Sequence, residues 1–255
     1  MIDTHSHIYS GEFDADIETV IHRAKEAGVE HIILPNVDSE SLPRMLALEN
    51  RFSGYCHAAI GLHPTSVNET FETELALIES ELKRRDYIAI GEIGLDLYWD
   101  KTHLDKQIFG LEAQLNWSLA YNLPVIIHIR DAFDETLRVF EKYKNSGLRG
   151  VFHSFTGTYK QAVQLLSFPD FYLGINGIVT FKNAGLDKVI AQIGPDRLLL
   201  ETDAPYLTPA PYRGTRNESA YTGIIAKKMA EIMEIDLKEL NKITTENSLK
   251  LFKMR

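Results

Sequence analysis

MIDTHSHIYSGEFDADIETVIHRAKEAGVEHIILPN, residues 1–36, holds two short apolar runs with a stretch of helical period between them. The runs are MIDTH at 1–5 and HIILPN at 31–36. The helix-like stretch is DADIETVIHRAKEAGV at 14–29, where Gly28 is expected to cap the carboxyl end. Strand, helix and strand in this order predict two parallel strands joined by a crossover helix.

The same rhythm continues along the rest of the sequence. Further β-rich runs begin at residues 56, 87, 124, 150, 171 and 197, and helix-like stretches such as 71–86 and 104–122 lie between them. Eight strand–helix units in 255 residues are typical of a TIM barrel, so we predict an α/β fold of one domain over residues 1–255. A doubly wound open sheet is the alternative, but it needs fewer strands, and no G-x-G-x-x-G follows the first run.

The composition and net charge limit the classes of protein to which this sequence can belong. No run of about 18 apolar residues is present, and the first residues lack the layout of a secretory signal, so we expect no membrane partner. A single cysteine, Cys56, cannot form an internal disulfide, which favours a cytoplasmic location. The net charge of −9 argues against a broad surface for duplex nucleic acid but leaves room for a local basic cleft.

Two histidines, His5 and His7, lie one residue apart at the end of the first run. In a strand, residues i and i+2 share a face, so their side chains are expected to point the same way. Neutral imidazole is a good ligand for zinc, manganese or iron, and two on one face form half of a metal site. A hydrogen-bonded turn is the alternative for this pair.

Polar residues also end several later runs: Glu92, His128, His153 and Asp203. Alternation predicts that Glu92 shares a face with Ile88 and Ile90. Any one of these residues could be a core polar group satisfied by the backbone. Because the carboxyl ends of parallel strands meet at one end of a barrel, however, six such residues together predict a metal site there.

Several blocks of the sequence closely resemble the signature blocks of TatD-type metal-dependent deoxyribonucleases, within the amidohydrolase-like barrel superfamily. These blocks are IDTHSH, GLHP, IAIGEIGLD, LPVIIHIRDA, VFHSFTG and LLLETDAPYLTP. The resemblance covers essentially the whole chain, in the family's order. It departs from the family at Ser6, where Cys is frequent, at Leu97, where Tyr is common, and at Ser219, where Pro is usual. Ser6 is expected to face away from the site, and the other two to affect substrate fit.

The resemblance implies two divalent metal ions, magnesium, manganese or zinc, and divides the ligands between them. One ion would be held by His5, His7, Glu92 and Asp203, and the second by Glu92, His128 and His153, with Glu92 bridging. Two such ions lower the pKa of a water molecule and clamp a phosphodiester. Asp203 would also orient or deprotonate the attacking water. Glu201 is expected to fix a histidine ligand, or to have a plain structural role.

The activity implied by the resemblance is trimming of single-stranded DNA, or another nucleic-acid end, of the 3′–5′ exonuclease type. A hydrolase of another bond is the first alternative, such as an aminoacyl-tRNA deacylase, an amidase or a lactonase, because related barrels run those reactions with similar centres. A catalytically silent binding barrel is the second. The filled ligand positions argue against it.

Candidate substrate contacts surround this centre. His63 could donate to a phosphate oxygen or stabilise the turn before Pro64. Arg130, two residues after His128, could contact phosphate or Asp131. Arg213 and Arg216 follow the eighth run, where barrels often bind phosphate.

Two aromatic residues, Tyr98 and Trp99, could stack a base of a single strand or only pack their loop. The remaining histidines are interpreted as ordinary surface or packing residues: His22, His31, His57 and His103.

Overall fold

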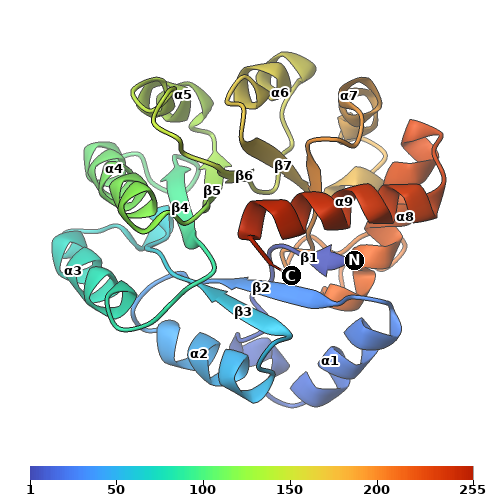
Figure 1. Ribbon diagram of the computed structural model, residues 1–255, viewed down its shortest axis with the longest axis horizontal. Coiled ribbons are helices and arrows are strands. Elements are labelled where there is room, and N and C mark those ends of the chain that lie inside the picture. The colour runs from blue at the N-terminus through green and yellow to red at the C-terminus, as the bar shows by residue number, and fades with distance from the viewer. Residues whose placement is uncertain (255) are drawn as a thin grey trace.

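The computed structural model describes residues 1–254, and within them eight strands alternate with α-helices (Figure 1). The strands are β1 (Ile2–Asp3), β2 (His31–Pro35), β3 (Cys56–Ala59), β4 (Ile90–Asp96), β5 (Val125–Arg130), β6 (Gly150–Phe152), β7 (Phe171–Ile175) and β8 (Leu198–Leu200). The helices are α1 (Ile17–Glu26), α2 (Leu42–Arg51), α3 (Phe71–Leu82), α4 (Leu104–Tyr121), α5 (Phe133–Glu141), α6 (Tyr159–Leu166), α7 (Leu186–Ile193), α8 (Thr222–Met233) and α9 (Leu237–Phe252). Short 3-10 helices cover Gly11–Phe13, Pro64–Ser66, Gly177–Thr180 and Ser219–Tyr221. In this part of the chain no helix has both the length and the apolar character that a bilayer crossing requires.

The strands close into a barrel with all pairings parallel. Strands β1 to β3 pair in order, and so do β4 to β8. Bridges between Ile60 and Ile90 and between Ser6 and Ala204 join the two sets, and the Thr4 amide donates to the Leu200 carbonyl at 3.0 Å. Figure 1 shows α1 to α8 around the outside of the strands, with α9 lying across one end of the barrel. The TIM barrel predicted from the strand–helix rhythm is confirmed.

Two apolar layers result from the alternation along each strand. Successive strands and α9 fill the barrel interior with Ile33, Ala59, Ala89, Ile126, Val151, Tyr172, Leu199, Leu251 and Phe252. Their strand neighbours, such as Ile32, Ile127 and Leu200, belong to the outer layer that packs against the helices. The interior is therefore a packed core, as is usual for this architecture.

Strand β4 departs from the predicted alternation. In the structure Ile90 belongs to the outer layer, and the pairing register between β4 and β5 shifts between Ile90 and Ile93. The shift resets the alternation, so that Ile93 and Leu95 face the helices while Glu92 reaches the barrel mouth. The expectation that Glu92 shares a face with Ile90 was wrong, because simple period-two counting does not allow for this irregularity.

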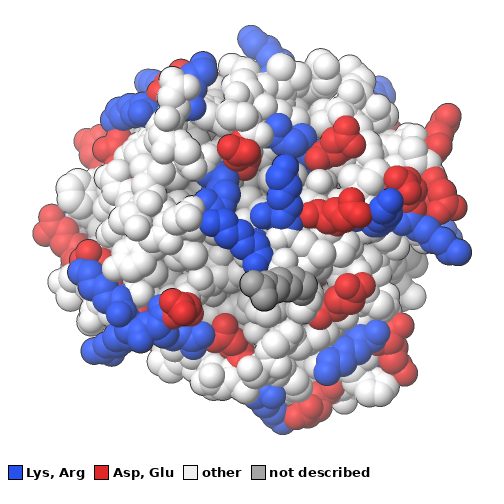
Figure 2. All heavy atoms as spheres, viewed as in Figure 1, with Lys and Arg blue, Asp and Glu red and all other residues white. Residues whose placement is uncertain are grey.

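Helix α9 crosses the amino-terminal end of the barrel, where Leu251 and Phe252 pack against interior residues of the strands (Figure 1). Figure 2 shows this face of the molecule, and basic and acidic side chains are intermingled on it. The carboxyl ends of the strands open on the opposite side. The predicted site residues lie at that opposite end.

Candidate metal centre

Glu92 lies at the centre of the predicted ligand group, and each of its carboxylate oxygens faces a different set of histidines. Oε2 lies 3.1 Å from Nε2 of His5 and 3.5 Å from Nε2 of His7. Oε1 lies 2.8 Å from Nδ1 of His128 and 3.0 Å from Nε2 of His153. The carboxylate is 3% exposed, so these nitrogens replace water around it.

Asp203 completes the side of the group formed by the first strand. Its Oδ1 lies 3.7 Å from Nε2 of both His5 and His7, and those two nitrogens are 3.0 Å apart. The Asp203 amide donates to the carbonyl of His5 at 2.9 Å, which ties the end of β8 to the end of β1. The structure thus brings all six predicted ligands together.

Hydrogen bonding fixes which nitrogen of His7 carries a proton. The Tyr9 hydroxyl donates its only proton to the Pro35 carbonyl at 2.6 Å and lies 2.9 Å from Nδ1 of His7. His7 must therefore donate from Nδ1, and in neutral His7 the Nε2 lone pair points at His5, Glu92 and Asp203. A lone pair directed at another imidazole nitrogen and two carboxylates fits a bound cation.

Glu201 lies behind His153. Its Oε1 is 3.4 Å from Nδ1 of His153 and accepts from the Ser154 amide at 2.6 Å. The carboxylate is fully buried, and a Cβ at residue 174 would lie 2.1 Å from its Oε2, so Gly174 makes the space for it. Such a carboxylate favours a proton on Nδ1, which leaves Nε2 free to face Glu92.

Asp96 is a site residue that the sequence interpretation missed. Its Oδ2 lies 3.0 Å from Nε2 of His128, and its Oδ1 accepts from the Tyr98 amide at 3.0 Å. Gln107 holds the Asp96 backbone by accepting from its amide and donating to its carbonyl. The sequence does indicate that Asp96 belongs to the site, because it follows Glu92 by four residues in a strand and so shares its face.

His63 differs from the other histidines in its hydrogen bonds. Its Nδ1 accepts from the Thr65 amide at 3.2 Å, and its Nε2 lies 3.3 Å from Oε1 of Glu92. Because Nδ1 is an acceptor, neutral His63 carries its proton on Nε2 and donates toward Glu92. The ligand atoms of His63, Glu92 and His128 lie close enough together to hold an ion, but a proton on Nε2 of His63 suits a hydrogen-bond donor to an anion better than a metal ligand.

Burial and mutual contact set the protonation of the group. Burial lowers the pKa of His5 well below its usual value, which keeps the imidazole neutral. Burial alone would raise the pKa of Glu92, but the surrounding histidines outweigh it and hold that pKa well below the usual range. Burial raises the pKa of Asp203 to about 6.

Burial alone would lower the pKa of His128 and of His153, but neighbouring carboxylates outweigh it. Asp96 and Glu92 raise the pKa of His128. Glu92 and Glu201 raise the pKa of His153 well above its usual value. A bound cation would displace the protons that these two histidines hold.

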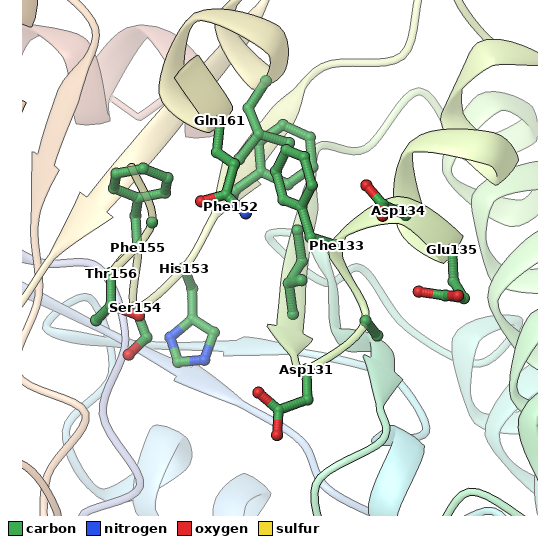
Figure 3. A pocket seen from close by; sticks show the side chains of 14 residues that line it. Asp131, Phe133, Asp134, Glu135, Phe152, His153, Ser154, Phe155, Thr156 and Gln161 are labelled. Carbon is green, nitrogen blue, oxygen red and sulfur yellow. The ribbon is translucent and has the colours of Figure 1, made fainter. Parts of the chain in front are cut away.

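The group opens into a cavity of about 930 Å³ at the carboxyl end of the barrel. His7, His63, Glu92, His128, His153 and Asp203 line it, together with Arg44, Asp96, Trp99, Arg130 and Tyr206 among others. A neighbouring pocket of about 440 Å³ lies between the segments after β5 and β6, and Figure 3 shows His153 and Asp131 extending to the same side of it. The two hollows share Ile129, His153, Ser154 and Thr156, so they are neighbours at the carboxyl end of the barrel.

The arginines predicted to contact substrate lie in different places. Arg130 lines the cavity, with its guanidinium carbon 3.8 Å from the centre of the Tyr98 ring. Arg216 pairs with Asp16 through two bonds of 2.8 and 2.7 Å, and Arg213 lies over the Phe181 ring. Among the described residues these two do not line the cavity, so their contact with substrate stays a prediction.

The other histidines lie apart from this cavity in residues 1–254. His31 and His57 face each other 3.0 Å apart at the beginnings of β2 and β3. His22 lies 3.3 Å from Glu26 on α1, and His103 precedes α4.

Comparisons with known proteins agree with this geometry. The family model for TatD related DNase matches residues 2–253. The chain belongs to this family. It is 38% identical over 255 residues to the "uncharacterized metal-dependent hydrolase YabD" of Bacillus subtilis (strain 168), covering 100% of this chain and 99% of that protein. It is 30% identical over 260 residues to the "3'-5' ssDNA/RNA exonuclease TatD" of Erwinia billingiae, covering 100% and 99%.

A solved TatD-family structure shares the fold. The crystal structure of YjjV, a TatD homologue from Escherichia coli K12, superimposes with a TM-score of 0.93 at 31% sequence identity and covers 100% of this chain and 98% of that one. The protein is therefore a metal-dependent hydrolase of the TatD family, with buried histidine and carboxylate clusters able to bind metal.

Two of the departures from the TatD-family pattern contact each other. The Ser6 hydroxyl lies 3.3 Å from the Ser219 hydroxyl, and both residues are buried. Leu97 is buried as well, and among the described residues none of the three lines the cavity. The expectation that residues 97 and 219 affect substrate fit finds no contact to support it. Ser6 and Ser219 instead contribute to packing between β1 and the segment before α8.

Proposed function

We propose that this TatD-family protein hydrolyses the terminal phosphodiester bonds of single-stranded nucleic acid in the 3′ to 5′ direction, with two divalent metal ions, magnesium, manganese or zinc. The proposal is supported mainly by the two carboxylate oxygens of Glu92, which face different histidines. One oxygen faces His5 and His7, and the other faces His128 and His153. With its oxygens divided in this way, Glu92 would help to hold both ions. Asp203 would complete the first ion's ligands.

When bound, the ions supply Lewis acidity to a phosphodiester oxygen and lower the pKa of a water molecule. Asp203 orients that water and accepts its proton, because its side chain is 15% exposed toward the cavity and touches the ligand group. The water oxygen bonds to phosphorus as the bond from phosphorus to the 3′ oxygen of the shortened strand breaks. That oxygen takes up a proton from solvent, a 5′-mononucleotide is released, and Asp203 returns its proton to solvent.

His63 would donate its Nε2 proton, which faces Glu92 in this structure, to a non-bridging oxygen of the phosphate when substrate binds. The hydrogen bond from the Thr65 amide to its Nδ1 supports this role, since it keeps the proton on the nitrogen that faces the cavity. Arg130, at the same cavity, contributes positive charge toward the strand. The cytoplasmic location expected from the single cysteine stays a prediction.

The test is hydrolysis of a 5′-labelled single-stranded oligonucleotide by the purified protein with magnesium or manganese. We expect a ladder of progressively shorter labelled products, which marks trimming from the 3′ end. The ladder should be absent with a chelator and in Asp203→Asn. Release of the labelled mononucleotide at the outset would reverse the proposed direction, and an intact strand with metal-loaded protein would overturn the nuclease proposal.

A second candidate, ester hydrolysis on an aminoacyl-nucleic acid, is favoured by the smaller pocket. Asp131, Asp134 and Glu135 line it, and Figure 3 shows Asp131 nearest to His153 with Asp134 and Glu135 farther away on α5. An ammonium group would suit these carboxylates better than a phosphate would. Release of the amino acid from an aminoacyl-tRNA, with the RNA left intact, would establish this candidate in place of the first.

A further inference from the structure

Two aromatic side chains at the cavity are unusually exposed. Trp99 is 72% exposed and Tyr98 is 53% exposed, and they lie in the segment directly after β4. Their rings meet edge to face with centroids 4.9 Å apart. Side chains that only packed this loop would be covered, whereas Trp99 leaves most of its surface to solvent while lining the cavity.

Arg130, the last residue of β5, lies over the rings of Tyr98 and Trp99. Its guanidinium carbon lies 3.8 Å from the Tyr98 ring centre and 5.3 Å from that of Trp99. A guanidinium held on aromatic faces keeps its charge and its donors for an anion, and cation–π contact restricts its motion. A nucleotide has a flat base that can stack on the aromatic rings and a phosphate that the guanidinium can bind.

The aromatic segment is also tied to the metal centre. The Asp96 Oδ1 atom accepts from the amides of Tyr98 and Trp99 at 3.0 and 3.5 Å, while its Oδ2 lies 3.0 Å from His128. One carboxylate therefore positions the exposed rings relative to a candidate ligand. A base stacked on these rings would place its own phosphate at a fixed distance from the centre.

We propose that Tyr98, Trp99 and Arg130 form a nucleobase platform, on which the base of a nucleotide next to the scissile phosphate stacks while Arg130 contacts a neighbouring phosphate. The inference rests on the proposed nuclease function and names what part of the strand the site recognises. Stacking does not read base identity, since every base has a π-face, so the platform selects nucleotides with a base over the bare sugar–phosphate chain.

The test compares two single strands, one of ordinary nucleotides and one whose terminal nucleotides lack bases. For the wild-type protein we expect kcat/KM to be about 5- to 150-fold higher on the ordinary strand, the range that one stacked base gives. In Trp99→Ala the ratio should fall toward one, with the melting temperature kept. Tyr121→Ala, an exposed aromatic change at the end of α4, is the matched control and should keep the wild-type ratio.

The outcomes of this test distinguish failure of the platform proposal from failure of the nuclease proposal. If the wild-type protein degrades both strands equally, or if the ratio survives in Trp99→Ala, the platform is overturned and the nuclease function stands. If it degrades neither strand while holding metal, the nuclease function fails and the platform with it. A second readout is quenching of Trp99 fluorescence in a Trp117→Phe background by the ordinary strand but not by the strand without bases. Equal quenching by both strands would also overturn the platform.

Discussion

The carboxylate of Glu201 lies 3.4 Å from the Nδ1 atom of His153, the ring nitrogen that faces away from Glu92. Both residues are buried, and Gly174 leaves the space that the carboxylate occupies. Within residues 1–254 this Nδ1 atom makes no hydrogen bond, but the carboxylate beside it would orient the imidazole and raise its basicity as a ligand once they pair. The hydrolase is therefore expected to depend on a residue that contacts neither metal nor substrate.

Replacing Glu201 by glutamine tests this dependence, since the amide has the same shape and can still accept from the Ser154 amide. We expect metal affinity and hydrolysis to fall about 10- to 100-fold, with the melting temperature of the apo protein little changed. Metal titration followed by calorimetry measures the affinity. The exposed Glu72→Gln on α3 serves as the control. Unchanged affinity in Glu201→Gln would assign Glu201 a packing role only.

Substituting Asp203 by asparagine should nearly abolish hydrolysis while the barrel remains folded. The change removes the charge that would both hold metal and accept the proton of the attacking water. Circular dichroism and thermal unfolding check the fold, and elemental analysis gives the metal content. Full activity in this variant would remove Asp203 from the mechanism.

Changing His63 to alanine should lower kcat/KM about 10- to 150-fold, as expected for the loss of one hydrogen bond to a charged group. Metal content should stay at the wild-type level, because the Nε2 proton directed at Glu92 makes His63 a donor. Thr65→Val, which removes only the hydroxyl beside Nδ1, should have a smaller effect. Loss of metal together with activity would make His63 a ligand and contradict the proposed role.

The ion pair between Asp16 and Arg216 predicts a pH-dependent contribution to stability. The hydrogen bond from Arg216 lowers the pKa of Asp16 below its usual value. A lowered carboxyl pKa stabilises the fold above the unfolded-state pKa of about 4, and the contribution is lost as pH falls through the folded-state pKa. Because the pair is partly exposed, Asp16→Asn should cost about 1 kcal/mol or less at pH 7.

Denaturant unfolding of the wild-type protein and Asp16→Asn at several pH values measures this contribution. The difference between the two proteins should shrink as the pH is lowered below about 4. A difference that grows with acidity would show that another group is responsible.

The fold was predictable because each strand is a short β-rich run bounded by helix-like sequence. All eight runs correspond to strands within residues 1–254. The helices expected at 14–29, 71–86 and 104–122 form as α1, α3 and α4, and Gly28 adopts a positive φ of 82° just after α1. Strand alternation failed at β4, where the register shifts, because such an irregularity leaves no mark in hydrophobic periodicity.

The site was predictable to the level of which side chains meet, since parallel strands bring their carboxyl ends together. The protonation of these side chains could not be predicted from the sequence. The proton position on His7 depends on the Pro35 carbonyl of β2 through Tyr9, and that on His63 depends on the amide of Thr65 in a 3-10 turn. These contacts are set by tertiary structure, which the residue pattern alone does not specify.

Leu251 and Phe252 cover the amino-terminal end of a barrel whose interior is already packed, so within residues 1–254 no passage runs through the barrel. A polymer cannot thread through such a barrel, so in the proposed nuclease the strand end would enter and the freed mononucleotide would leave at the same carboxyl-terminal mouth. Product exit and advance of the shortened strand then compete for one passage. Mononucleotides should accordingly act as competitive inhibitors, and slow product escape should favour release of the strand between successive cuts.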